Sequence, residues 1–295
     1  MKTFKLLALC LATAGFMTAC APDELVEATN PTPQPNVTPK PNYRLKKVVY
    51  SFVNRYFFYE NGRLSGERWI GTDGMETNLV TLLYDSQNRL TTYTTQSTRP
   101  SSPWEIGSRV AYLYNADGQI AVKQTYTLQQ GGSPDAPVTR LASVDSLSYN
   151  SAGQVSLSLL YSYKQQTGNY SAQPVQLSRT TYQYDAIGNL TEEITLSTPL
   201  VNWGSSTTAR KRVFEYDTKE NPYHLIASPV FGQEGWSKNN VLKTTTYQVY
   251  LYTKGEQPDF TRSTPTVTDF AYEYKDALPE RKAGAATEGY EYETY

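Results

Sequence analysis

Few side chains in this sequence have the types and spacing that chemistry requires. The 295 residues include one histidine, His224, and two cysteines. A single histidine cannot build a usual zinc site, and no motif places a nucleophile beside it, so we interpret His224 as a packing residue. Glu192 and Glu193 are adjacent on an expected strand, where neighbouring side chains point to opposite faces, so they cannot form a catalytic pair. With no phosphate-binding loop or dinucleotide fingerprint either, we expect no catalytic residue, no metal and no cofactor.

Cys20 is the side chain to which the sequence assigns a modification. Lys2 and Lys5 precede an apolar run, residues 6–16, that is typical of a signal peptide and too short to span a bilayer as a helix. The run ends in Met17-Thr18-Ala19-Cys20, which resembles a bacterial lipobox, with Met where that family usually has Leu. The resemblance implies cleavage before Cys20 and lipidation of its thiol. Ordinary signal-peptidase cleavage after residue 21 is the alternative.

The residues that follow Cys20 predict a cellular location and a spacer. Asp23 and Glu24 resemble the acidic surface-export signal of Bacteroidota lipoproteins. Five prolines between residues 31 and 41 favour an extended chain that cannot bury a core. We therefore expect a signal peptide (1–19), a lipidated cysteine with a proline-rich tether (20–42) and a repetitive domain (43–295). The protein would be anchored in the outer membrane, and the acidic residues favour its exposure at the cell surface.

A repeated hairpin organises the domain. Its best copy is Tyr182–Leu190, in which Asp185 can accept turn N–H groups and Gly188 can supply the left-handed residue of a bulged turn. The pattern is Tyr-[Asp/Asn]-x-x-Gly-x-[Leu/Ile/Val], and it recurs about every 30 residues, the length of two strands and their connections. The other near-full copies begin at Tyr84, Tyr114 and Tyr149, with worn copies at Tyr59, which is one residue shorter, Tyr216 and Tyr274.

Between these turns the sequence alternates as strands do. Residues 155–163 place Val, Leu and Tyr on one face and Ser156, Ser158 and Ser162 on the other, which we expect to be solvated. No amphipathic helix of useful length is evident. We predict an all-β antiparallel meander of roughly a dozen strands, forming a curled or partly closed sheet.

Three segments resemble uncharacterised Bacteroidota lipoproteins with a domain of unknown function. They are Asn221-Pro222-Tyr223, the Ser-x-Asn-Asn segment at 237–240, and a closing pair of Tyr-x-Tyr strands at 272–274 and 290–292. The hairpins themselves resemble the Tyr-Asp (YD) repeats of Rhs-type proteins, which build shells around a toxin. This chain is far shorter, so the resemblance implies the hairpin but not encapsulation.

We predict that a binding surface lies in the segments where the repeat is interrupted and aromatic residues occur. In a meander the tight turns share one end, and the long returns at the other end would carry Trp104, Tyr170 and Trp203. Trp236 lies in a region, 221–240, where the repeat lapses. Exposed aromatics in loops on a rigid scaffold are typical of binding surfaces, although these rings could instead fold back over the end of the sheet. The 27 basic and 28 acidic residues are interspersed, which argues against nucleic acid.

We therefore expect a non-enzymatic envelope lipoprotein with a binding or structural role, whose partner would be a glycan or an outer-membrane protein. Two alternatives remain open at this point. One is an envelope polysaccharide hydrolase, which would need two carboxylates across a cleft. The other is an Rhs-derived remnant or an immunity-type protein.

Overall fold

The repeats form strands that follow one another around a sheet. The computed structural model describes residues 42–98, 105–129, 138–164, 170–198, 207–226, 228–252 and 256–295. Seventeen strands occur among them. In chain order they are β1 (Tyr43–Val49), β2 (Val53–Glu60), β3 (Arg63–Gly71), β4 (Glu76–Tyr84), β5 (Leu90–Ser97), β6 (Glu105–Tyr114), β7 (Ile120–Gln129), β8 (Val138–Tyr149), β9 (Val155–Lys164), β10 (Tyr170–Tyr184), β11 (Leu190–Ser197), β12 (Thr207–Glu220), β13 (Asn239–Leu251), β14 (Thr266–Asp269), β15 (Ala271–Lys275), β16 (Leu278–Ala283) and β17 (Glu288–Thr294).

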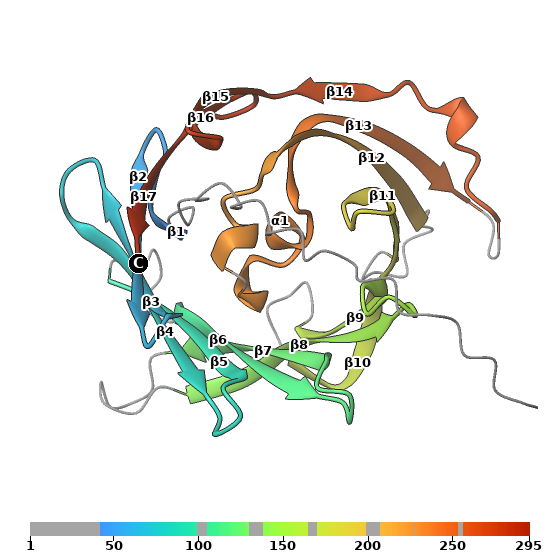
Figure 1. Cartoon of the computed structure of the whole chain (residues 1–295). Helices are drawn as coiled ribbons and strands as arrows, with labels where there is room; N and C mark the ends of the chain where they lie inside the picture. Colours follow the sequence, from blue (N-terminus) through green and yellow to red (C-terminus); the bar gives the residue numbers. More distant parts are fainter. Residues whose placement is uncertain are drawn as a thin grey trace, which may run out of the picture. The chain divides into compact units, whose positions relative to one another are not determined.

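The strands make one antiparallel meander that closes on itself (Figure 1). Consecutive strands pair from β1 to β14, and β15, β16 and β17 continue the order. The first strand, β1, pairs with both β2 and β17, which joins the two ends of the meander. The predicted fold class is therefore confirmed, with more strands than the dozen expected and with a nearly closed, barrel-like sheet.

The tight turns of the four near-full copies have the predicted backbone chemistry. Gly188 has φ +99°, and Asn88 takes the same position in another copy with φ +64°. The Asp185 carboxylate accepts from the backbone N–H groups of Ile187, Gly188 and Asn189 at 2.8–3.0 Å. A register shift follows at Tyr184, as a bulged turn requires.

The motif tyrosine has a role that spacing alone did not reveal. The hydroxyl of Tyr184 donates to the carbonyl oxygen of Val155, the last motif position of the preceding hairpin, at 2.9 Å. The same bond recurs around the sheet, so each hairpin is fixed to the one before it. The other donors and acceptors are Tyr59 to Leu45, Tyr84 to Leu64, Tyr114 to Leu90, Tyr149 to Ile120, Tyr216 to Leu190 and Tyr292 to Pro279, all at 2.6–2.8 Å. We call this series the tyrosine ladder.

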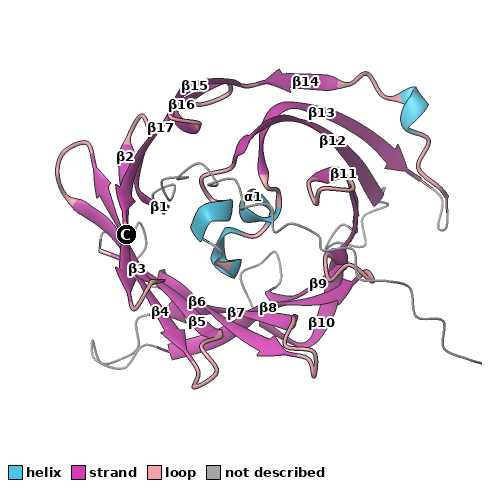
Figure 2. Cartoon of the chain, in the orientation of Figure 1, coloured by secondary structure: helices cyan, strands magenta, loops and turns pink. Residues whose placement is uncertain are grey.

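The region where the repeat lapses folds inside the ring of strands (Figures 1 and 2). Residues 221–238, the inner segment, connect β12 to β13 and carry η1 (His224–Ile226), η2 (Pro229–Phe231) and α1 (Gln233–Trp236). Tyr223, Ile226 and Phe231 of this segment are buried in one cluster with side chains of the sheet. Those are Leu45, Val48, Phe57, Leu64, Val80, Leu82, Leu90, Tyr112 and Tyr290. The inner segment is therefore part of the hydrophobic core.

The remaining described helix is η3 (Phe260–Arg262), which precedes β14. Each helix among the described residues has three or four residues. None of these helices is long and apolar enough to cross a membrane.

The expected face assignment is wrong for β9. Ser158 and Ser162 are both 8% exposed, whereas they were expected to be solvated. Ser158 donates to Asp145 on β8, on the face that contacts the inner segment. The bulge at the start of β9 adds one residue to that strand, so the buried positions shift from Val155 to Ser158 and Ser162. Counting alternate residues through a bulge inverts every assignment beyond it.

Candidate functional site

A cavity of about 470 Å³ lies at the tight-turn end of the sheet, between the turns and the inner segment. Consecutive hairpins supply its outer wall, and Ile226, Ser228 and Pro229 of the inner segment close it from within. The wall contributed by the sheet includes Gly62, Arg63, Leu64, Tyr84, Asn88, Arg89, Leu90, Tyr114, Gly118, Gln119, Ile120 and Tyr149. We call this space the turn-end cavity.

The arginines of the turn-end cavity stack on its tyrosines. The guanidinium carbon of Arg63 lies 4.2 Å from the centre of the Tyr84 ring, and that of Arg89 lies 4.6 Å from the Tyr114 ring. The tyrosine ladder already holds both phenol hydroxyls on backbone carbonyls. Burial raises the pKa of Tyr84 and of Tyr114, an effect that the neighbouring arginines oppose. The rings are therefore neutral, fixed platforms for the two cations.

The two arginines differ in how their charges are balanced. Arg89 is paired with Asp85, whose Oδ2 lies 2.8 Å from its Nε and Nη2. Bonds from Arg89, the backbone N–H first, hold the pKa of Asp85 below its usual range. Arg63 donates to the neutral side chain of Asn88, and no carboxylate of a described residue pairs with it. The described lining of the cavity contains no Asp, Glu or His, so Arg63 gives it an unbalanced positive charge.

Ser228 adds an unused polar group to the inner wall. Its Oγ is buried and has no hydrogen-bond partner among the described residues. Buried hydroxyls are normally bonded to protein or water. Because this oxygen has almost no accessible surface, a ligand in the turn-end cavity could bond it only if neighbouring groups moved.

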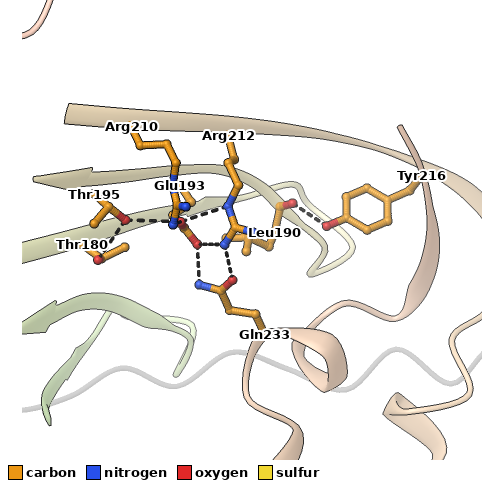
Figure 3. Close-up of polar contacts among 8 residues, drawn as sticks. All are labelled: Thr180, Leu190, Glu193, Thr195, Arg210, Arg212, Tyr216 and Gln233. Carbon is orange, nitrogen blue, oxygen red and sulfur yellow. Dashed lines mark hydrogen bonds and ion pairs between the residues drawn. The ribbon is translucent and has the colours of Figure 1, made fainter. Parts of the chain in front are cut away.

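A buried ion pair positions the inner segment against β11 and β12 (Figure 3). Glu193 is 2% exposed and accepts from Arg212 Nε at 3.1 Å and Nη2 at 2.6 Å. Gln233 of α1 donates to Glu193 and accepts from Arg212 at 2.7 Å. On the opposite face Glu192 pairs with Lys211 at 2.5 Å. The two glutamates therefore face opposite ways, as predicted, and Glu193 anchors the inner segment.

A second buried pair supports the other side of the inner segment. Glu67 is fully buried and accepts from Arg55 Nε at 2.7 Å and Nη2 at 2.9 Å. The Arg55 guanidinium carbon also lies 4.8 Å from the centre of the Phe231 ring in η2. Trp69 Nε1 donates to the same carboxylate at 3.3 Å. These contacts hold η2, and with it the inner wall of the turn-end cavity, in one place.

A smaller cavity of about 100 Å³ contains two carboxylates, Glu234 and Glu288. Glu288 accepts from Lys282 Nζ at 3.1 Å and from the Tyr290 hydroxyl at 2.7 Å. Loss of hydration raises the pKa of the Glu234 carboxyl. Small-molecule sites begin at roughly 300 Å³, so this space is too small for a sugar ring.

A third hollow, of about 480 Å³, lies beside the C-terminal hairpin. Its charged residues carry both signs, and the inner segment contributes no wall. Lys275 pairs with Glu280 at 3.7 Å, and Glu291 pairs with Lys47 at 2.9 Å. Two of its three carboxylates are therefore already paired, and the inner segment does not enclose it, so the turn-end cavity is the stronger candidate site.

The aromatic residues predicted to form a binding surface are not gathered by the described structure. Trp104 and Trp203 lie outside the described residues, as does Cys20. Tyr170 is half-buried at the start of β10 and donates to Thr127 Oγ1 at 2.9 Å. Trp236 packs edge-to-face on Tyr182 at 5.2 Å, inside the sheet. A surface built on these four residues stays a prediction.

His224, which the sequence led us to interpret as a packing residue, lies in η1 of the inner segment. His224 Nδ1 lies 3.0 Å from the Gly235 carbonyl oxygen, a contact within the inner segment that fits a packing role. The described residues contain no group of three or more His, Cys, Asp or Glu side chains that could hold a metal ion.

Sequence reasoning missed Arg63 and Arg89 because it placed function at the opposite end of the sheet. A signal was present in the repeat itself. The position before the last motif residue is Arg63 and Arg89 in the first two copies, but Gln119, Gln154 and Asn189 in the next three. The charge difference between otherwise similar turns marks the first copies.

Comparison with known proteins finds similarity of fold only. No protein-family model and no curated protein matches the sequence. A porin-like protein from Bacteroides vulgatus ATCC 8482 is 10% identical, with a TM-score of 0.46 over 85% of this chain and 98% of that one. A porin-like protein from Bacteroides uniformis ATCC 8492 is 13% identical, with a TM-score of 0.46 over 85% and 95%. The TcdB2-TccC3 structure matches 79% of this chain and 17% of that one, at 9% identity and a TM-score of 0.17. These values assign neither a family nor a function.

Proposed function

We propose that the protein is a non-enzymatic, lipid-anchored component of the cell envelope that binds a glycan in the turn-end cavity. The observation that carries this proposal is the cavity itself, about 470 Å³ in volume and walled by consecutive hairpins and the inner segment. That volume lies within the range of small-molecule sites, which are largely preformed and combine apolar walls with a few polar groups.

The wall of the turn-end cavity is preorganised. The tyrosine ladder fixes the hairpins to one another, and the Glu193 and Glu67 ion pairs fix the inner segment. A site that is already formed loses little conformational entropy on binding. Its neutral polar groups, the amides of Asn88 and Gln119, suit the hydroxyl groups of a sugar.

Binding without catalysis is supported by the composition of the wall. Hydrolysis of a glycosidic bond uses two carboxylates that flank it. The described residues that line the turn-end cavity include no carboxylate, and the nearest thing to such a pair, Glu234 with Glu288, lines a space of about 100 Å³. A carboxylate pair is therefore placed where no sugar ring fits.

A glycan array probed with the full-length chain in detergent tests the binding proposal. Gln119→Trp fills the turn-end cavity and should abolish binding. Gln154→Trp is the matched control, because Gln154 occupies the same position in the next hairpin but does not line the cavity. Its side-chain oxygen accepts a hydrogen bond from Asn150 Nδ2 at 3.0 Å, as that of Gln119 does from Asn115 Nδ2 at 3.2 Å. If no glycan binds, or if both variants bind as the unchanged protein does, the proposal fails.

The anchoring part of the proposal depends on Cys20. Cys20→Ser should release the protein from the membrane fraction, because its anchor would be the lipid on that thiol. Ala21→Ser serves as the control for a change at the neighbouring position. A Cys20→Ser protein that still sediments with membranes would contradict lipid anchoring. Protease treatment of whole cells then tests surface exposure.

A further inference from the structure

We propose that the turn-end cavity selects an acidic sugar, whose anionic substituent binds Arg63 while the sugar ring lies toward Gln119. This inference rests on the proposed glycan-binding function and specifies its substrate class. The ligand chemistry is a carboxylate, sulfate or phosphate carried on a sugar ring.

The charge of the cavity favours an anion. Arg63 and Arg89 are the ionisable cations among its described lining residues, and no described carboxylate lines it. Asp85 balances Arg89 through contacts of 2.8 Å, whereas Arg63 is bonded to the amide of Asn88. A bound anion would pair with Arg63 and supply the charge that the lining lacks.

The guanidinium of Arg63 is held ready for such a ligand. Its stacking on Tyr84, at 4.2 Å, fixes the plane of the group. Its bond to Asn88 uses Nη1, which leaves Nε and Nη2 without a bond to any described residue. Two N–H groups in a fixed plane match the two oxygens of a carboxylate, sulfate or phosphate.

The polarity of the cavity changes along the row of turns. The arginines belong to the first two turns of the wall, and Gln119 of the next turn supplies a neutral amide. An anion alone would leave the neutral part without a partner, and a neutral sugar would leave Arg63 unpaired. A sugar with one acidic substituent satisfies both.

The test compares acidic glycans with their neutral counterparts by titration calorimetry on the full-length chain. The probes are oligogalacturonate and its methyl ester, and a sulfated oligosaccharide and its desulfated form. We expect the acidic member of at least one pair to bind about tenfold more tightly, as a charge-assisted hydrogen bond provides, and to weaken as salt rises. These pairs also distinguish carboxylate from sulfate, and a phosphorylated sugar provides the third arm.

The variant Arg63→Gln should remove the preference for the acidic member. Arg63→Lys, which keeps the charge but not the planar pair of donors, should restore part of it. Arg68→Gln is the matched control, because Arg68 lies on the same strand but does not line the cavity, has a side chain that is 56% exposed, and pairs with Glu76 at 3.6 Å. Melting temperatures of all three variants show that they are folded.

Two results with the glycan pairs would overturn the inference while leaving the proposed function intact. One is equal binding of acidic and neutral members by the unchanged protein. The other is a preference for acid that Arg63→Gln retains. Displacement of the glycan by millimolar inorganic phosphate or sulfate alone, with no contribution from the sugar, would show a free-anion site and would also overturn it. Absence of all glycan binding would remove the proposed function and this inference together.

Discussion

The tyrosine ladder makes a quantitative prediction about stability. Tyr184→Phe removes one hydroxyl and leaves the ring in place. That hydroxyl donates to the Val155 carbonyl at 2.9 Å, and Val155 is 7% exposed. A neutral hydrogen bond contributes about 1 kcal/mol, and a buried carbonyl left without a donor costs about 1–3 kcal/mol. We expect the free energy of unfolding to fall by about 1–2 kcal/mol.

Urea denaturation followed by circular dichroism measures this change, and calorimetry should show Tm falling by about 2–4 °C for each kcal/mol. Tyr126→Phe is the control, because its hydroxyl bonds Gln124 on the same strand at 2.9 Å and water can replace that bond. The control should cost less than about 0.5 kcal/mol. Equal losses in the two variants would refute the view that the ladder joins one hairpin to the next.

A second ladder substitution extends the test. Tyr114→Phe removes the bond to Leu90 of an earlier hairpin, at 2.7 Å. Because the two bonds share no partner, their effects should add within about 0.5 kcal/mol in the double variant. A double variant no less stable than either single variant would show that the ladder bonds are not independent supports.

Three further predictions follow from the turns, the inner segment and the buried phenols. Gly188→Val should destabilise the protein by about 1–2 kcal/mol, since φ is +99° there and a β-branched residue resists it; an unchanged urea midpoint would contradict the bulged turn. Glu193→Ala should cost about 3 kcal/mol, because it leaves Arg212 and Gln233 without their buried partner, and native-state proteolysis should then cut the inner segment. Burial raises the pKa of Tyr216 to about 12, against about 10 in an unfolded chain. This contribution to stability is therefore complete below pH 10 and is lost as pH rises toward 12. Urea midpoints at pH 8, 9, 10 and 11 measure the loss, and a midpoint that does not fall above pH 10 would contradict it.

The sequence predicted the local geometry of the hairpins because that geometry depends on a few adjacent residues. Asp185 accepts N–H groups within its own turn, and Gly188 adopts a φ that few other residues tolerate. Such preferences act without the rest of the protein. They were sufficient to predict an all-β antiparallel meander.

The face of the sheet on which each side chain lies was harder to predict from the sequence, because one bulge shifts the alternation of inward and outward residues. Ser158 was expected in solvent and is buried, since the bulge after Tyr149 shifts the register. The pattern of alternation holds on each side of a bulge but not across it. Only the pairing of β8 with β9 shows where the extra residue lies.

The candidate site depends on contacts between residues that are far apart in the chain. The lapse of the repeat at 221–240 was visible, but its position inside the sheet was not. Phe231 meets Arg55, and Gln233 meets Glu193, across long stretches of chain. The turn-end cavity exists because this segment turns inward, which no local preference specifies.

By itself the sequence determined the repeat, the turn chemistry, the antiparallel all-β class and the expectation of lipidation at Cys20. These follow from residues next to one another. Closure of β1 on β17, the tyrosine ladder, the buried serines and the cavity beside Arg63 were decided by the tertiary structure. The physical reason is that each of these features depends on pairing or packing between distant residues, whose free energy appears only once the sheet has closed around the inner segment.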